Sequence, residues 1–256
     1  MATRDRDITV DKLGEDRPLE IAQHCDGYRF GLDALLLATD LPPIEPGATV
    51  VELGAAQGVV SLCIARRHPT ARVVALERQE SLYDLLVDNI ARNDLQSRVE
   101  PLRGDVRDFR DILSPHSAQL VVCNPPYFRR GSRRPSNNAE RAAARHEMHG
   151  GLTDFVDAAR YTLEQRGWFK LISPPLRLGD MMSARVETDL SLASLRFFHS
   201  RKTSDAYLFE ALLRRGGAPD IQVCPPLYIY RNDKDYTGEV QRRIDEAPRA
   251  PDGADS

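Results

Sequence analysis

The sequence predicts an α/β fold in which a seven-stranded, mostly parallel sheet carries helices on both faces and one antiparallel strand near its C-terminal end. Short β-branched runs alternate with amphipathic stretches along the middle of the chain, as is typical of βαβ units. The final two strand candidates are separated only by the polar residues 200–205, which predicts a hairpin. With 256 residues, 41% of them hydrophobic, the chain can bury a sizeable core.

The first five strands should run parallel with right-handed crossovers, because a long segment separates each strand from the next. The five are Thr49–Leu53, Arg72–Glu77, Arg98–Arg103, Gln119–Cys123 and Trp168–Ser173. The hairpin pairs Leu195–His199 with Tyr207–Leu213. The expected helices are Leu32–Thr39, Val59–Arg67, Ser81–Asn93, Leu152–Thr162 and Leu178–Asp189.

Composition predicts one domain over residues 18–246, with flexible polar tails at 1–17 and 247–256. The chain starts with charged and polar residues and contains no apolar run approaching about 18 residues. These features favour neither a membrane protein nor a secreted one, and they predict a cytoplasmic location. Its four cysteines are widely spaced, so we expect no metal site. A net charge of −3 argues against indiscriminate binding of nucleic acid.

A glycine loop follows the first parallel strand and precedes a helix. Glycine at such a turn lets the backbone approach a ligand. The dinucleotide fingerprint would need glycine where Ala56 and Val59 stand, which disfavours an NAD-dependent oxidoreductase. The segment instead resembles the (D/E)xGxGxG pattern of methyltransferases at Glu52, Gly54 and Gly58. These three residues are therefore candidates for binding S-adenosylmethionine.

Two acidic residues continue this pattern at the ends of the next two strands. Glu77 ends the second strand, where a carboxylate can accept hydrogen bonds from both hydroxyls of a ribose. Asp105 follows the third strand and resembles the residue that accepts from the amino group of the cofactor's adenine. Because ligands of open α/β sheets bind at the carboxyl ends of the strands, the loop and the two acids predict one cofactor pocket.

The most specific motif, Asn124-Pro125-Pro126-Tyr127, follows the fourth strand. It resembles the (N/D)PP(Y/F) motif of methyltransferases that act on planar amino nitrogens. The lone pair of such a nitrogen is delocalised, so two acceptors are needed to pull it towards tetrahedral geometry. We expect the Asn124 side-chain oxygen and the Pro125 carbonyl to be these acceptors, with Asn124 also adjoining the cofactor. The prolines restrict the backbone, and Tyr127 offers a face on which a flipped base can stack.

A basic segment follows this motif. Residues 124–150 carry six arginines against two glutamates, although the whole chain is slightly acidic. Arginine pairs bidentately with phosphate, so a loop of this composition beside the site predicts contact with an RNA backbone. The candidate RNA-binding residues are Arg129, Arg130, Arg133, Arg134 and Arg145.

Together these motifs resemble the bacterial tRNA1(Val) adenine-N6 methyltransferases, which modify adenosine 37. The resemblance covers residues 20–245 and includes the segments 27–33, 124–127, 144–147, 226–230 and 236–239. It implies the class I (Rossmann-like) methyltransferase fold, S-adenosylmethionine as cofactor and tRNA as partner. It also implies that Asp33 touches the methionyl end of the cofactor, although a role for Asp33 as a helix N-cap fits equally well.

Several alternatives share part of this pattern. A ribosomal RNA base methyltransferase would use the same motifs. A glutamine-N5 methyltransferase of release factors shares the Asn-Pro-Pro-Tyr chemistry, but usually has a large helical region before its first sheet strand, whereas only 48 residues precede Thr49. An RNA-binding module with a decayed active site is disfavoured by the intact Asn124, Pro125 and Tyr127.

Overall fold

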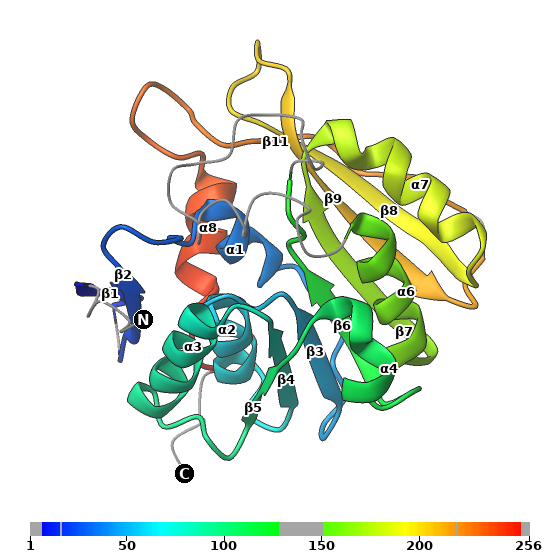
Figure 1. Cartoon of the computed structure of the whole chain (residues 1–256). Helices are drawn as coiled ribbons and strands as arrows, with labels where there is room; N and C mark the ends of the chain where they lie inside the picture. Colours follow the sequence, from blue (N-terminus) through cyan, green and yellow to red (C-terminus); the bar gives the residue numbers. More distant parts are fainter. Residues whose placement is uncertain (1–6, 16, 128–150, 219, 252–256) are drawn as a thin grey trace.

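The computed structural model describes residues 7–15, 17–127, 151–218 and 220–251. Its centre is a mixed sheet with the strand order β10-β8-β9-β7-β6-β3-β4-β5, and β11 pairs with β8 beside β10 (Figure 1). Its seven long strands are β3 (Thr49–Leu53), β4 (Arg72–Glu77), β5 (Val99–Arg103), β6 (Ala118–Cys123), β7 (Leu163–Ser173), β8 (Leu190–His199) and β9 (Ala206–Arg215). The predicted α/β class and all seven predicted strands are confirmed.

Strand direction also follows the prediction. β3 to β7 pair in parallel, and β9 runs antiparallel to both β7 and β8. β3 lies between β4 and β6, with Val51 opposite Val74 on one side and Val121 on the other. The chain therefore builds the sheet outwards in one direction from β3 and in the other from β6. Ligands of open α/β sheets bind in the crevice outside such a switch point.

Helices cover both faces of the sheet (Figure 1). One face carries the helices whose buried residues join Val50 and Val122 in the core: α1 (Leu32–Leu37), α2 (Val59–Arg67), α3 (Glu80–Arg92) and α8 (Gly238–Glu246). The other face carries those that pack with Val51 and Val121: α4 (Phe109–Ile112), α6 (Leu152–Thr162) and α7 (Leu178–Val186). Alternate residues of β3 and β6 thus point to opposite cores, as a sheet buried on both faces requires.

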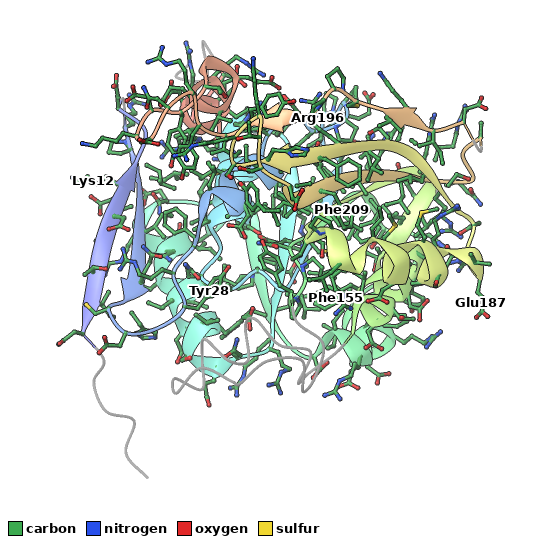
Figure 2. The ribbon with its side chains drawn as sticks, turned by 90° about the horizontal axis from the view of Figure 1, so that it is seen from above. Lys12, Tyr28, Phe155, Glu187, Arg196 and Phe209 are labelled. Atoms are coloured by element: carbon green, nitrogen blue, oxygen red, sulfur yellow. The ribbon has the colours of Figure 1, made fainter. Side chains whose placement is uncertain are left out.

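An antiparallel hairpin precedes the sheet. β1 (Ile8–Leu13) pairs with β2 (Leu19–His24) along its whole length, with Val10 opposite Ala22. The prediction of a flexible tail over residues 1–17 is therefore wrong for residues 8–13. The reason is a long-range contact, because β2 docks against α3. In Figure 2, Lys12 of this hairpin and Glu187 after α7 lie at opposite ends of the molecule.

The C-terminal end contains elements that the sequence did not predict. α8 follows the short strands β10 (Gln222–Val223) and β11 (Leu227–Tyr228), which extend the edge of the sheet along β8. Ala247 and Pro248, placed by prediction in a flexible tail, are buried. The 3-10 turns are η1 (Val106–Asp108) and η2 (Pro175–Arg177). Within the described residues, no helix combines the length and the hydrophobicity needed to cross a membrane.

Candidate active site

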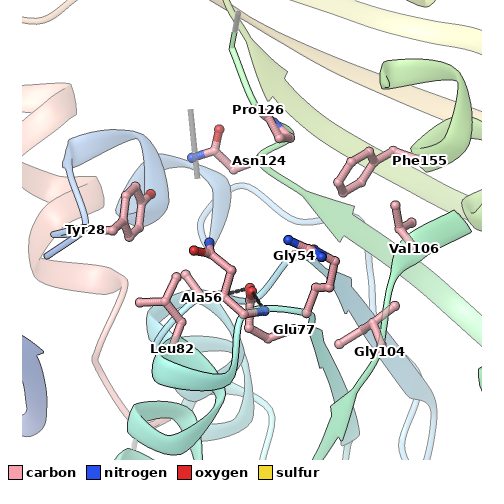
Figure 3. Close-up of a pocket in the computed structure, with 13 residues that line it drawn as sticks. Tyr28, Gly54, Ala56, Glu77, Leu82, Gly104, Val106, Asn124, Pro126 and Phe155 are labelled. Carbon is pink, nitrogen blue, oxygen red and sulfur yellow. Dashed lines mark hydrogen bonds between the residues drawn. The ribbon is translucent and has the colours of Figure 1, made fainter. Parts of the chain in front are cut away.

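A cavity of about 650 Å³, counting its open side, lies at the carboxyl ends of β3, β4, β5 and β6. Figure 3 shows Gly54 and Glu77 near its middle, Asn124 and Pro126 on one side, and the rings of Tyr28 and Phe155 flanking it. The lining residues are Tyr28, Gly54, Ala56, Leu76, Glu77, Arg78, Gln79, Leu82, Gly104, Val106, Asn124, Pro126 and Phe155.

The glycine loop bends sharply away from β3. Gly54, Ala56 and Gly58 have φ angles of 76°, 50° and 90°, all in the left-handed region that favours glycine. At Gly58 a Cβ would lie 2.4 Å from Cδ1 of Leu86, so no larger residue fits without movement. The Gly54 and Ala55 amides both donate to the carbonyl of Leu76, at 2.9 Å each, which closes the loop against β4.

Glu77 holds the same loop through its side chain. Its Oε2 accepts from the Ala56 amide at 2.8 Å, and its Oε1 accepts from the Gln79 amide at 2.7 Å. Burial raises the pKa of this carboxyl, although its backbone hydrogen bonds oppose the shift. Glu77 lines the cavity, and its role in binding the cofactor stays a prediction. Each carboxylate oxygen retains acceptor capacity beyond these bonds, which suits a vicinal diol.

Glu52 lies beneath the loop and does not line the cavity. Its Oε2 accepts from the Ser61 amide at 2.9 Å and from the Ser61 hydroxyl, so it satisfies the N-terminal turn of α2, whose N-cap Gly58 has no side chain to do so. Burial raises the pKa of Glu52 to about 8. The contacts thus give Glu52 a part in building the loop.

Asp105 is also not among the residues that line the cavity, although its neighbours Gly104 and Val106 are. Its carboxylate accepts two hydrogen bonds from the Arg107 guanidinium, at 3.0 and 2.7 Å, and one from the Arg107 amide at 3.0 Å. Desolvation raises its pKa, but these bonds outweigh that effect and leave the pKa below its ordinary value. The described ion pairs of the Asp105 side chain are therefore with two arginines, Arg107 and Arg78.

Asn124 stands at the edge of the cavity, directly after β6. Its Nδ2 donates to Oδ2 of Asp33 at 2.7 Å. Its Oδ1 is buried and has no hydrogen-bond partner within the part of the chain that the structure describes. Figure 3 shows this oxygen pointing away from Glu77. A buried acceptor without a partner costs free energy, and is explained if a ligand donates to it.

Tyr127 and Asp33 meet behind Asn124. The Tyr127 hydroxyl donates to Oδ2 of Asp33, and the Tyr127 ring packs against the core. Neither residue lines the cavity. Asp33 lies in the first turn of α1, where Gly31 is the N-cap, so the N-cap alternative for Asp33 is wrong.

Two aromatic rings of the cavity were missed from the sequence. Phe155, in the first turn of α6, lies 3.5 Å from the position that a Cβ on Gly54 would occupy. Tyr28 follows β2 and packs with Ala56, Leu82 and Ala22 in a small apolar cluster. Phe155 belongs to no motif, whereas Tyr28 lies in the segment 27–33 that carries part of the family resemblance. Only the packing of α6 and of the hairpin brings these rings to the site.

The five arginines predicted to bind RNA, Arg129, Arg130, Arg133, Arg134 and Arg145, lie outside the described residues. Among the residues that the structure does describe, no cluster of three or more histidine, cysteine, aspartate or glutamate side chains could hold a metal ion.

Comparison with known proteins supports the resemblance found in the sequence. Residues 42–129 match the family model of the TRM5/TYW2 methyltransferase domain. A Porphyromonas gingivalis protein named tRNA1(Val) (adenine(37)-N6)-methyltransferase is 27% identical over 192 residues, which cover 73% of this chain and 72% of the relative. The family resemblance predicted from the sequence is thereby confirmed at this level of similarity.

Solved structures support the fold. A predicted O-methyltransferase from Agrobacterium tumefaciens aligns with a TM-score of 0.67 at 21% identity, covering 86% of this chain and 98% of that one. The TYW2 protein of M. jannaschii, solved in complex with AdoMet, aligns with a TM-score of 0.56 at 15% identity, covering 84% and 90%. The predicted class I methyltransferase fold is confirmed.

Proposed function

We propose that this chain transfers a methyl group from S-adenosylmethionine to the exocyclic N6 of an adenine in tRNA, with adenosine 37 of tRNA1(Val) as the acceptor. The names of its relatives support the enzyme class and the tRNA substrate, and the AdoMet complex of a structural neighbour supports the cofactor. The observation that carries the chemistry is Oδ1 of Asn124, which is buried at the edge of the cavity and has no hydrogen-bond partner among the described residues. From a tRNA substrate we further infer that the reaction takes place in the cytoplasm.

The cavity suits S-adenosylmethionine at each part of that molecule. Glu77 offers carboxylate oxygens to the ribose hydroxyls, while Gly54 permits close approach of the methionyl part to the backbone. Leu82 and Val106 supply apolar walls for the adenine. When bound, the cofactor supplies an electrophilic methyl group on a sulfonium. The cavity adjoins Asn124, so this methyl group and the acceptor nitrogen would meet beside it.

The residues of this chain act on the acceptor amine. Asn124 Oδ1 accepts one hydrogen of the amino group, and the Pro125 carbonyl accepts the other. Both acceptors draw the lone pair out of the ring system. Rate acceleration then comes from orientation and fixed dipoles. The ring of Phe155, beside Pro126 in Figure 3, lines the cavity and offers a face on which the flipped base can stack.

The proposal is tested with labelled S-adenosylmethionine and three separate acceptors: unmodified tRNA, ribosomal RNA and a release factor. We expect label in tRNA, recovered as N6-methyladenosine after nucleoside analysis. Label only in ribosomal RNA or only in protein would replace the tRNA assignment with one of the two enzyme alternatives. Binding of cofactor and RNA without transfer would indicate a decayed active site.

Asn124→Ala gives the residue-level test of the same proposal. We expect the methylation rate to fall by a factor of about 10² to 10³, as when one preorganised hydrogen-bonding group of an active site is removed. Affinity for S-adenosylhomocysteine, measured by calorimetry, should change little because Glu77 and the glycine loop remain. A variant with unchanged rate would exclude Asn124 from the chemistry.

A further inference from the structure

Asp33 carries two hydrogen bonds from the motif at the end of β6. Its Oδ2 accepts from Nδ2 of Asn124 at 2.7 Å and from the hydroxyl of Tyr127. The two donors lie 91 and 94 positions from Asp33 in sequence, and they meet it because α1 packs against α2, α8 and β7. Asp33 itself lies outside the cavity wall that Asn124 lines.

These contacts determine which end of the Asn124 amide faces Asp33. An ionised carboxylate has acceptors and no donor, so it can pair only with the NH₂ end. The oxygen must then face away from Asp33, as it does, and it is left buried and unpartnered among the described residues. If the amide turned over, a donor would stand where the chemistry requires an acceptor, and Oδ1 would face the carboxylate.

Tyr127 strengthens the same arrangement. Burial, and then the neighbouring Asp33 carboxylate, raise the pKa of Tyr127 well above its ordinary value, so the phenol keeps its proton and donates it to Asp33. Two donors therefore converge on one carboxylate oxygen from the two ends of the Asn-Pro-Pro-Tyr motif. The residues on both sides of the two prolines are therefore held by the same carboxylate.

We propose that Asp33 is a positioning residue, which fixes the orientation of the Asn124 amide so that Oδ1 presents an acceptor to the substrate amine. This inference rests on the proposed function and differs from the expectation that Asp33 touches the cofactor. The charge at position 33 selects the orientation. An aspartate there can bond only to the NH₂ end of the Asn124 amide, whereas an asparagine there could bond to either end.

A four-protein cycle tests the proposal: wild type, Asp33→Asn, Asn124→Asp and the double variant. In Asp33→Asn the Asn124 amide can turn over, and kcat should fall about tenfold or more. In Asn124→Asp two carboxylates face each other, and kcat should fall about 10²-fold. In the double variant the new amide at position 33 donates to the new carboxylate at position 124, whose second oxygen is an acceptor in either orientation. There kcat should return to within about tenfold of wild type.

Cofactor affinity separates this role from direct contact with the cofactor. Calorimetry with S-adenosylhomocysteine should give a Kd for Asp33→Asn within about twofold of wild type, because Asp33 does not line the cavity. Asp84→Asn, an exposed change on α3 that removes the same charge, serves as the matched control and should leave kcat unchanged. A weakened Kd for Asp33→Asn, with no recovery of kcat in the double variant, would overturn the proposal.

A failure of the proposed function would be recognised separately, as absence of methylation by the wild-type protein on every acceptor. Urea unfolding of the same four proteins then still tests whether Asp33 orients Asn124, because it needs no substrate. Each single variant should lower the midpoint, and the double variant should recover most of the combined loss because its donor–acceptor pair is restored. Additive losses in the four proteins would show that Asp33 does not orient Asn124.

Discussion

At the scale of single residues, the acidic residue that opens the glycine-loop motif has a structural role. Glu52 is 3% exposed and bonds to Ser61 at the start of α2. Its folded-state pKa of about 8 means that the folded protein keeps this carboxyl mostly protonated at pH 7. A neutral acid beneath the cofactor loop is compatible with its burial, whereas an isolated buried carboxylate would be costly.

The pKa of Glu52 has a consequence for stability. Because the pKa rises from 4.5 in the unfolded chain to about 8 in the folded protein, its contribution is fully present below pH 4.5 and is lost as pH rises towards 8. The unfolding free energy should fall by up to about 1.4 kcal/mol per pH unit across this window. Glu52→Gln, which mimics the neutral form, should flatten the slope.

Urea denaturation from pH 5 to pH 8.5 measures this slope. Glu187→Gln, an exposed change after α7, is the control and should leave the slope as it is. Glu77 adds to the slope of both variants because burial raises its pKa in the same direction. If Glu52→Gln kept the wild-type slope, the carboxyl would be titrating normally and the buried, protonated form would be wrong.

Ala56 is the residue at which this chain departs from the glycine pattern. Its φ of 50° is unfavourable for alanine by about 1 kcal/mol, and its methyl group lines the cavity. Ala56→Gly removes this strain, but the extra conformational entropy of glycine stabilises the unfolded chain by about 0.4–1 kcal/mol. The net effect on the free energy of unfolding should therefore be close to zero. Affinity for S-adenosylhomocysteine should hold or rise, because the cavity widens.

The matched control is Ala91→Gly on the exposed side of α3, which carries the entropic cost without any strain to relieve. It should lower stability by about 1 kcal/mol. Thermal denaturation and calorimetry on both variants make the comparison. A loss at Ala56 as large as that at Ala91 would mean that the left-handed conformation of Ala56 is not strained.

At the scale of elements, two asparagines at the end of α3 dock the N-terminal hairpin. Asn89 accepts from the Ala22 amide at 2.7 Å, and donates to the carbonyls of Ala22 at 3.1 Å and Gln57 at 2.9 Å. One turn later, Asn93 bonds to the amide and carbonyl of Glu20 at 2.9 and 2.8 Å. The two side-chain amides thus act on β2 as a neighbouring strand would.

Asn89→Ala should lower the unfolding free energy by about 2–4 kcal/mol, since it leaves buried backbone groups of β2 and of the glycine loop unsatisfied. Asn93→Ala should cost about 1 kcal/mol because its bonds are partly exposed. Hydrogen exchange at the Ala22 amide gives a local measure and should accelerate only in Asn89→Ala. Equal losses in the two variants would contradict the difference in burial.

The elements that sequence reasoning missed share a physical cause. α8 was overlooked because its buried face includes a charged residue: Arg243 is fully buried and pairs with Asp40, which lies after α1. The strand β1, ITVDKL, was placed in a tail because it is polar and only half-buried, and the hairpin that it forms with β2 is held by α3. In both elements the stabilising partner is distant in sequence, so local periodicity carries little of the signal.

At the scale of the whole molecule, the position of the site could be predicted once the parallel strands had been recognised, because the site lies at their carboxyl ends. Gly54, Glu77 and Asn124 lie at the ends of parallel strands, and parallel strands bring their carboxyl ends to one edge. The direction in which a side chain points could not be predicted. Asp105 follows its strand as expected, yet turns to Arg107, and Phe155 reaches the cavity only through the placement of α6.

The predicted RNA contact also depends on the whole molecule. The basic segment must attract RNA although the net charge of the chain is −3. Replacing Arg129, Arg130, Arg133 and Arg134 together with serine should weaken RNA binding and lower the slope of log affinity against log salt by up to about 3. The Kd for S-adenosylhomocysteine should not change. Filter binding at several salt concentrations measures the effect. An unchanged slope would mean that these four arginines are solvated and do not contact RNA phosphates.

The hairpin bears on how this protein can be shortened. β2 is covered on one edge by β1 and on the other by the amides of Asn89 and Asn93. A chain started at residue 18, the boundary that composition suggests, would strip one of these edges and expose a row of unpaired backbone groups. Such an edge is a template for self-association. Shortened forms of the protein should therefore retain the first strand, or they will tend to precipitate.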